Sequence, residues 1–330
     1  MPTVTIIVPC YNEQATIGLL LQAIYDQSYP RVQMEVVIAD GLSTDQTLSQ
    51  IQAFTQTHPD LKVRVVENPQ RTIPSGLNQA LRSALGDIII RLDAHSIPYS
   101  NYVAGCVAAL QNQCGENVGG VWEILPGGSG WLAKSIAAAA AHPFGAGDAR
   151  YRIGGLAQEV DTVPFGAFRR TLIEKIGYFD ESLLTNEDYE FNVRIQQSGG
   201  KIWMDPQIRT RYFARANLSA LWKQYWRYGF WKVRMLRRYP QSLRWRQALP
   251  PLFVFSLILF GIFSFWMPFF RWLLIFQLII YSLVIILAGV RKALSKRYMP
   301  YVLGLPLALS VMHLAWGSGA LLSMLRYEKP

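Results

Sequence analysis

Two side chains that can bind a metal follow a short apolar strand. Asp93 and His95 come after three isoleucines in the segment GDIIIRLDAH at 86–95. Because they stand two positions apart where the strand ends, both side chains can converge on one point in the turn. A carboxylate and an imidazole at such a point suit a divalent cation with a phosphate on its far side. Asp is also common in solvated turns, so the motif alone fits that interpretation too.

A second group of acids stands at the start of a predicted helix. Glu187, Asp188 and Glu190 lie in the segment NEDYE at 186–190, which precedes Phe191 and Ile195 of the helix. Acids at a helix start ordinarily do no more than complement the helix dipole. Their chemical meaning therefore depends on which elements bring other polar groups to the same place.

Alternating elements supply such a place. Four runs of apolar and β-branched residues predict strands at 3–9, 35–40, 62–67 and 87–93. Amphipathic stripes between them predict three helices, the first capped by Asn12 and the third at 75–85. This order predicts an α/β fold with a parallel sheet and right-handed crossovers. Ligands of such sheets bind beyond the carboxyl ends of the strands. There we expect segments 9–13, 68–71 and 93–95, with Asp40.

The glycine motifs of two common nucleotide sites are missing. No GxGxxG follows the first strand, which disfavours a dinucleotide dehydrogenase, and no GxxxxGK[ST] occurs, which excludes a P-loop. The remaining possibility is a nucleotide site that uses the Asp40 carboxylate for base or ribose and a metal for phosphate.

Charge divides the chain. Residues 1–205 carry 14 Lys/Arg and 21 Asp/Glu, whereas residues 206–330 carry 18 Lys/Arg and a single acid, Glu328. A basic tail can bind nucleic acid or an anionic membrane surface. Because the tail also holds long apolar runs, in a chain that is 51% hydrophobic, we expect a membrane and no nucleic acid.

Three apolar runs without charge predict membrane spans at 249–270, 272–290 and about 299–325. Lys and Arg gather before the first run and after the second, which places the N-terminal domain in the cytoplasm by the positive-inside rule. The apolar run at 4–8 is too short for a signal peptide, and three cysteines without a CxxC pair fit a reducing compartment. We therefore expect a multi-pass protein of the cell inner (cytoplasmic) membrane.

Four motifs occur in the order and spacing of a known family. They are IIVPCYNEQATIG, VVIADGLSTDQT, GLNQALRSALGDIIIRLDAH and VPFGAFRRTLIEKIGYFDESLLTNEDYEFNVRI. Over about residues 3–240 the chain resembles the inverting family 2 glycosyltransferases. Within them it is most similar to the membrane-attached bacterial enzymes of the succinoglycan glucosyltransferase type. The resemblance implies an α/β domain of the GT-A fold, a Rossmann-like nucleotide-diphospho-sugar transferase domain, followed by an α-helical transmembrane region.

The resemblance also assigns residues to the donor. Those expected at the nucleoside-diphosphate sugar, a UDP-sugar by analogy, are Pro9, Tyr11, Glu13, Asp40, Arg71, Asn78, Arg91, Asp93 and Arg227. Asp93 and His95 stand where the family has its metal-binding Asp-x-Asp. Because imidazole is a softer ligand than the carboxylate it replaces, Mn²⁺ is expected to suit the site at least as well as Mg²⁺.

By the same match, Asp188 is the general base and Glu187 its neighbour, which could raise the pKa of the base through like-charge repulsion. Trp131, Phe165 and Gly166 are expected on the acceptor side. The Gly- and Ala-rich segment at 127–155 suits either a mobile loop over a substrate or a packed Ala-rich helix.

Residues 216–239 predict a helix with aromatic and apolar side chains on one side and cations such as Lys223 and Arg234 on another. This profile is typical of the membrane interface. QYWRY at 224–228 is also similar to the Gln-x-x-Arg-Trp motif of processive synthases, with Tyr228 in place of the tryptophan. Arg227 is thus expected to meet either the donor diphosphate or a lipid headgroup.

The sequence therefore predicts a GT-A catalytic domain at 1–215, a basic interfacial region at 216–248 and three transmembrane helices at 249–330. The expected reaction moves a sugar, glucose from UDP-glucose by analogy, onto a lipid-linked saccharide acceptor in exopolysaccharide biosynthesis. Two alternatives stay open: a polyprenyl-phosphate sugar synthase, and a non-catalytic membrane subunit of a polysaccharide assembly complex.

Overall fold

The structure is a computed structural model that describes residues 1–326. These residues form two compact units, one made of Met1–Glu123 and Ala149–Tyr212 and the other of Ile124–Asp148 and the chain from Phe213 onward. The segment at 124–148 therefore groups with the C-terminal helices, although it precedes the second acidic motif in the sequence. The predicted limit near residue 215 stays a prediction.

A parallel sheet forms the first half of the first unit. Its strands are β1 (Val4–Cys10), β2 (Met34–Asp40), β3 (Lys62–Glu67) and β4 (Ile88–Arg91). They stand in the order β3-β2-β1-β4, and every pair between them is parallel. The four strands expected from the sequence are thus confirmed.

The sheet continues beyond these four strands. The further strands are β5 (Ile97–Pro98), β6 (Asn117–Leu125), β7 (Gln158–Glu159), β8 (Ala167–Arg169) and β9 (Ile202–Phe213). β8 pairs antiparallel with both β4 and β6, and the order along the sheet is β3-β2-β1-β4-β8-β6-β9-β5, with β7 on β9. The result is a mixed sheet whose parallel half ends next to β8.

Helices cover both faces of this sheet. Side chains of α1 (Ile17–Tyr25), α2 (Thr47–Thr57) and α4 (Tyr102–Gln111) join one apolar core with Ile6 and Val8 of β1. Side chains of α3 (Ile73–Ser83), α8 (Thr171–Ile176) and α9 (Glu187–Gln197) join a second core with Ile7. Because successive strand residues point to opposite faces, a continuous apolar strand supplies both cores. Two further short helices are η1 (Arg31–Gln33) and α7 (Arg150–Ile153), and Tyr151 of α7 packs against the second core.

One predicted cap is wrong. Helix α1 begins after Thr16, which makes no side-chain capping bond, and not after Asn12. Asn12 has a positive φ of 54°, which Asn tolerates better than most residues, and its Oδ1 accepts a hydrogen bond of 2.8 Å from Thr44 N. Its side chain thus ties the loop after β1 to the loop after β2.

The second unit is helical. It contains α5 (Trp131–Ala140), α6 (Pro143–Ala146), α10 (Leu218–Arg238), η2 (Pro240–Ser242), α11 (Trp245–Phe263), α12 (Pro268–Lys296) and α13 (Tyr301–Leu325). Ile136 and Ala139 of α5 are fully buried, so the Ala-rich segment forms a packed helix, one of the two predicted alternatives. α10 confirms the basic helix expected at 216–239. Its N-cap Asn217 accepts a hydrogen bond of 2.9 Å from Ala220 N.

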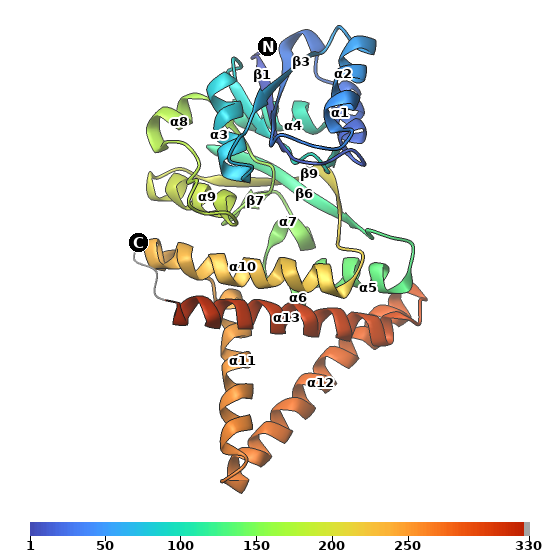
Figure 1. The fold of residues 1–330 in the computed structure, drawn as a ribbon, viewed down its shortest axis with the longest axis vertical. Helices are drawn as coiled ribbons and strands as arrows, with labels where there is room; N and C mark the ends of the chain where they lie inside the picture. The colour runs from blue at the N-terminus through green and yellow to red at the C-terminus, as the bar shows by residue number, and fades with distance from the viewer. Residues whose placement is uncertain (327–330) are drawn as a thin grey trace. The chain divides into compact units, whose positions relative to one another are not determined.

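Three of these helices, α11, α12 and α13, are long and apolar enough to cross a membrane. The first ends at Phe263, earlier than the predicted 270, because Pro268 starts α12 and four residues between them turn the chain. Within this unit α10 and α13 lie side by side, and α11 and α12 leave that pair and converge at their other ends (Figure 1).

Candidate active site

One buried arginine joins the two acidic motifs. Arg91 is the last residue of β4 and is 6% exposed. Its Nη2 donates to Glu187 Oε1 at 2.9 Å and to Asp93 Oδ1 at 3.2 Å. The fold therefore brings the strand-end motif and the start of α9 to one place, although nearly a hundred residues separate them in the sequence.

The charges around Arg91 are unbalanced. Burial alone lowers the pKa of its guanidinium, but the carboxylates of Asp93, Glu187 and Asp188 outweigh burial and hold that pKa above the usual range. Burial raises the pKa of the Glu187 carboxyl to about 7; Arg91 opposes the rise and Asp188 adds to it. Three carboxyl groups share one guanidinium, so this place suits an additional positive charge.

Glu187 and Asp188 differ in how deeply they are buried. Asn186, in the left-handed region at φ 71°, is the N-cap residue of α9, and Glu187, the first residue of the helix, is 5% exposed. Asp188 is only partly buried, and its Oδ1 accepts a hydrogen bond of 2.7 Å from Tyr189 N. A base has to reach substrate, so Asp188 fits the predicted proton acceptor and Glu187 fits a neighbour held by Arg91.

The predicted metal ligands, Asp93 and His95, suit a cation that is held partly by the protein and partly by donor phosphates. His95 Nδ1 lies 2.9 Å from Glu13 Oε1, an arrangement in which a carboxylate orients an imidazole for metal binding. Asp93 contributes a partly exposed carboxylate. Within residues 1–326, no three His, Cys, Asp or Glu side chains cluster as a metal site. A cation here would thus rely on one or two protein ligands together with donor phosphates, as Mg²⁺ sites commonly do.

The loops after β1, β2 and β3 meet at the expected edge. Asp40 is buried and accepts hydrogen bonds from Ser43 N at 2.9 Å and Ser43 Oγ at 2.6 Å. Arg71 and Tyr11 are exposed, and the guanidinium lies 5.6 Å from the centre of the Tyr11 ring. Pro9 packs near the start of α3, where a Cβ on Gly76 would lie 3.2 Å from the Pro9 Cβ. The nucleotide role of these residues stays a prediction.

Three predicted residues are bound into the protein interior. Asn78 donates to Phe179 O at 2.9 Å and to Glu181 Oε1 at 2.8 Å, so both of its amide hydrogens are used and it holds the segment that leads to α9. Phe165 is 4% exposed and its carbonyl accepts a hydrogen bond from the Tyr102 hydroxyl. A Cβ on Gly166 would lie 2.1 Å from Asn117 Oδ1, so packing explains the glycine. In this structure their contacts are structural.

Trp131 and Arg227 belong to the second unit. Trp131 begins α5 and is 46% exposed, and Arg227 lies on α10 with an exposed side chain. Their predicted roles, at an acceptor and at a donor diphosphate or lipid headgroup, stay predictions.

Sequence reasoning missed Tyr151. Burial raises the pKa of its hydroxyl, the cation of Arg152 opposes the rise, and the charge of Asp188 adds to it. The Tyr151 ring packs edge-on against Trp122, with ring centres 5.0 Å apart. One signal was available: the segment Arg150-Tyr151-Arg152 stands out in the Gly-rich stretch. Tyr151 therefore lies within the electrostatic influence of Asp188.

Comparison with known proteins decides the family. The family model described as glycosyl transferase family 2 matches residues 5–177, slightly more than half of the chain. The chain belongs to glycosyl transferase family 2. It is a glycosyltransferase, and the expected enzyme class and fold are confirmed.

Two relatives match over nearly their whole length. The dolichyl N-acetyl-alpha-D-glucosaminyl phosphate 3-beta-D-2,3-diacetamido-2,3-dideoxy-beta-D-glucuronosyltransferase of Methanococcus voltae is 28% identical over 95% of this chain and 94% of its own. The succinoglycan biosynthesis protein ExoA of Rhizobium meliloti is 28% identical over 98% and 96%.

Solved structures share the fold. The mannosyltransferase PcManGT from Pyrobaculum calidifontis, in complex with GDP-Man and Mn²⁺, has a TM-score of 0.64 at 22% identity and covers 96% of this chain and 87% of its own. S. aureus TarS 1-349 in complex with UDP-GlcNAc has a TM-score of 0.52 at 16% identity and covers 93% and 90%. At these identities the likeness establishes the GT-A-like fold alone.

Proposed function

We propose that this enzyme transfers one sugar from a nucleoside diphosphate to a lipid-linked saccharide acceptor at the cytoplasmic face of the inner membrane, with inversion at the anomeric carbon. The observation that carries the proposal is the contact of Arg91 with both Asp93 and Glu187, which places the start of α9 beside the end of β4. The apolar C-terminal helices support an acceptor held in the bilayer.

The proposed reaction is a single displacement. An acceptor hydroxyl oxygen forms a bond to the anomeric carbon as the bond from that carbon to the phosphate oxygen breaks, and the nucleoside diphosphate leaves. Asp188 takes the hydroxyl proton. Glu187, fixed by Arg91, holds the first turn of α9 so that Asp188 faces the acceptor.

Asp93 and His95 are the residues that would hold a divalent cation, Mn²⁺ or Mg²⁺. When bound, such a cation offsets negative charge on the departing phosphates. The excess of carboxylates around Arg91 and the Glu13–His95 contact support this assignment.

Arg91 also has donors to offer to a ligand. Its Nε and Nη1 are buried and make no hydrogen bond with any residue in 1–326. Buried donors of a charged group are costly when unpaired, so oxygens of a bound sugar or phosphate are suitable partners. This supports the predicted place of Arg91 among the donor-binding residues.

The donor to test first is UDP-glucose, because a relative of nearly full length acts in succinoglycan biosynthesis. UDP-GlcNAc and GDP-mannose complete the panel, since TarS and PcManGT were solved with them. A lipid-linked acceptor has support in the relative from Methanococcus voltae, whose name includes a dolichyl-linked sugar phosphate.

The deciding experiment measures nucleotide release by purified protein in lipid, with each donor and extracted membrane lipids, with Mn²⁺, Mg²⁺ or EDTA. We expect cation-dependent release from one donor and a loss of ~10²–10⁴-fold in Asp188→Asn. Asp60→Asn, which changes an exposed carboxylate paired with Arg31, is the matched control.

Two outcomes contradict parts of the proposal. If Asp188→Asn keeps most of its activity, a lipid phosphate that needs no base is the better acceptor, as in a polyprenyl-phosphate sugar synthase. Absence of release from every donor would favour a non-catalytic membrane subunit.

A further inference from the structure

Helix α13 differs from the other two apolar helices in what covers it. In the most apolar stretch of α11 and of α12, 11% and 17% of residues are buried, whereas in α13 half are buried. Leu305, Leu309 and Met312 of α13 are at most 1% exposed. A helix that is apolar all round is either a membrane span or a buried core helix. Many apolar residues of α13 are therefore buried against other parts of the protein and do not require a membrane.

The main partner of α13 is α10. A Cβ on Gly229 of α10 would lie 2.1 Å from Trp316 O, and a Cβ on Gly319 of α13 would lie 2.2 Å from Trp226 O. The backbones therefore approach closely at both glycines. Further along, Arg237 of α10 donates to Ser323 O at 2.7 Å. The two helices run side by side in the same direction (Figure 1).

Helix α10 cannot enter hydrocarbon. Lys223, Arg227, Arg237 and Arg238 are exposed and are spread over most of its length. At 1.5 Å per residue they cover about 22 Å, most of the thickness of a hydrocarbon core. A charged side chain inside a bilayer is strongly unfavourable. Since α13 follows α10 along its length, α13 cannot cross without carrying these cations into the lipid.

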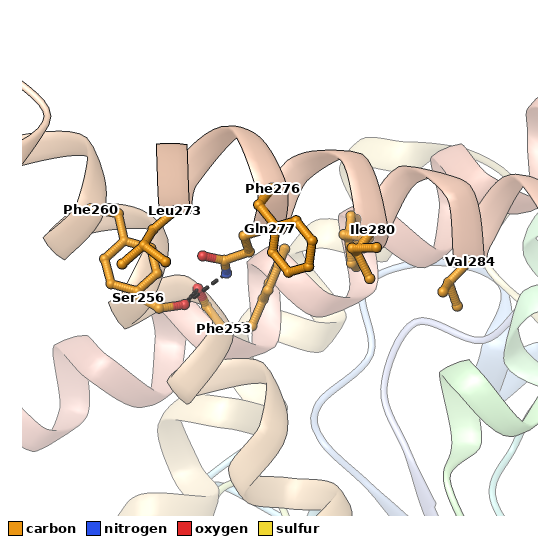
Figure 2. Close-up of a pocket in the computed structure, with 9 residues that line it drawn as sticks. Phe253, Ser256, Phe260, Leu273, Phe276, Gln277, Ile280 and Val284 are labelled. Carbon is orange, nitrogen blue, oxygen red and sulfur yellow. Dashed lines mark hydrogen bonds between the residues drawn. The ribbon is translucent and has the colours of Figure 1, made fainter. Parts of the chain in front are cut away.

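Helices α11 and α12 have the surface of a bilayer hairpin. Large apolar side chains on both are exposed, among them Phe255, Ile258, Phe276 and Leu287, and the turn between the helices presents Phe265 and Trp266. Across a cleft lined mostly by apolar side chains, Gln277 Nε2 donates to Ser256 Oγ at 2.7 Å (Figure 2). Such a polar bond between two apolar helices is typical of helices that pack in lipid.

We propose that α10 and α13 form a helix pair that lies along an anionic phospholipid surface, and that the α11–α12 hairpin alone crosses the bilayer. Exposed cations of α10 such as Lys223 contact lipid phosphates, and the apolar residues of α13 that stay exposed, such as Leu303 and Leu307, face the acyl boundary. The end of α13 then lies on the same side of the membrane as the N-terminal unit. Three crossings would place it on the opposite side.

The test uses the full chain with one protease-cleavable tag before Met1 and a second after Pro330. Sealed vesicles are treated with protease, and only molecules whose first tag is cleaved are counted. We expect the second tag to be cleaved in the same molecules without detergent. If it is cleaved only after detergent, α13 crosses the membrane and the proposal is overturned.

Trp266→Cys in a Cys114→Ser background reports on which side of the membrane the turn of the α11–α12 hairpin lies. In the vesicles whose first tag is accessible, a membrane-impermeant maleimide should label this cysteine only after detergent. Labelling of intact vesicles would show that the hairpin does not cross, which overturns that part of the proposal. Neither readout depends on glycosyl transfer.

Discussion

At the scale of single residues, the geometry of Arg91 matters as much as its charge. One nitrogen, Nη2, serves both Asp93 and Glu187. The two hydrogens of Nη2 are held in fixed directions in the plane of the guanidinium, whereas the ammonium of lysine carries the same charge on a flexible stem and rotates. We expect Arg91→Lys to lower the rate by about 10²-fold through misplacement of the base, while the protein stays folded. The initial rate of nucleotide release and a melting curve measure the two effects.

Arg64→Lys is the matched control for that prediction. Arg64 also pairs with a buried glutamate, Glu35, at 2.9 Å, but at the opposite end of the parallel strands. An equal loss of rate in both variants, or no loss in Arg91→Lys, would remove Arg91 from the proposed positioning role.

The Glu187 carboxyl predicts a pH dependence of stability. Its pKa rises from 4.5 to about 7 on folding, chiefly through burial. The folded state then binds more protons than the unfolded state between these values, so this group stabilises at low pH and its contribution is lost as pH rises toward 7. Over the full range, the loss of this contribution lowers the free energy of unfolding by about 3 kcal/mol.

Glu187→Gln keeps the shape of the side chain and removes the titration. We expect the melting temperature of the wild type to fall from pH 5 to pH 8 more steeply than that of Glu187→Gln, measured in the same detergent. Parallel curves would show that Glu187 does not titrate in this window.

At the scale of elements, the close approach of α10 and α13 predicts that two glycine-to-alanine substitutions affect stability differently. Gly319→Ala places a methyl group 2.2 Å from Trp226 O, and overpacking of this kind costs about 1–3 kcal/mol. A Cβ on Gly261 of α11 would meet no atom of residues 1–326 within 4 Å apart from the backbone of its own helix. Alanine favours a helix over glycine by about 1 kcal/mol.

We therefore expect Gly319→Ala to lower the melting temperature in detergent and Gly261→Ala to preserve or raise it. Both are glycine-to-alanine changes in apolar helices, so each controls for the other. If Gly319→Ala melts like the wild type, the close backbone contact between α10 and α13 is wrong.

Some helices and strands could be predicted from local sequence patterns and others could not. The four parallel strands and α10 followed from β-branched runs and helical stripes, because each pattern is local. The strands β5, β6, β7 and β9 were missed because they are short or, like β9, mix polar and apolar residues, and they form by pairing with distant partners. The contact of Arg91 with Glu187 and the use of Asn78 to hold Phe179 depend on tertiary structure that no local pattern encodes.

At the scale of the whole molecule, the chain passes between its two units three times, after Glu123, Asp148 and Tyr212. A cut at the sequence-predicted boundary of 215 therefore leaves α5 behind without its partners. Within the second unit α5 packs on α13, with Ile136 and Ala139 fully buried, and a Cβ on Gly304 would lie 2.1 Å from Ser135 Oγ. Removal of α13 exposes this apolar face to water.

We expect a fragment of residues 1–215 to aggregate, and the same fragment with residues 128–146 replaced by a Gly/Ser linker of equal length to be soluble and to melt cooperatively. Size-exclusion chromatography and thermal unfolding compare the two. The linker keeps the length of the connection, so any difference belongs to the α5 face and not to the N-terminal sheet. A monodisperse 1–215 fragment would instead mean that α5 is independent of the C-terminal helices, and that the boundary read from the sequence is the structural one.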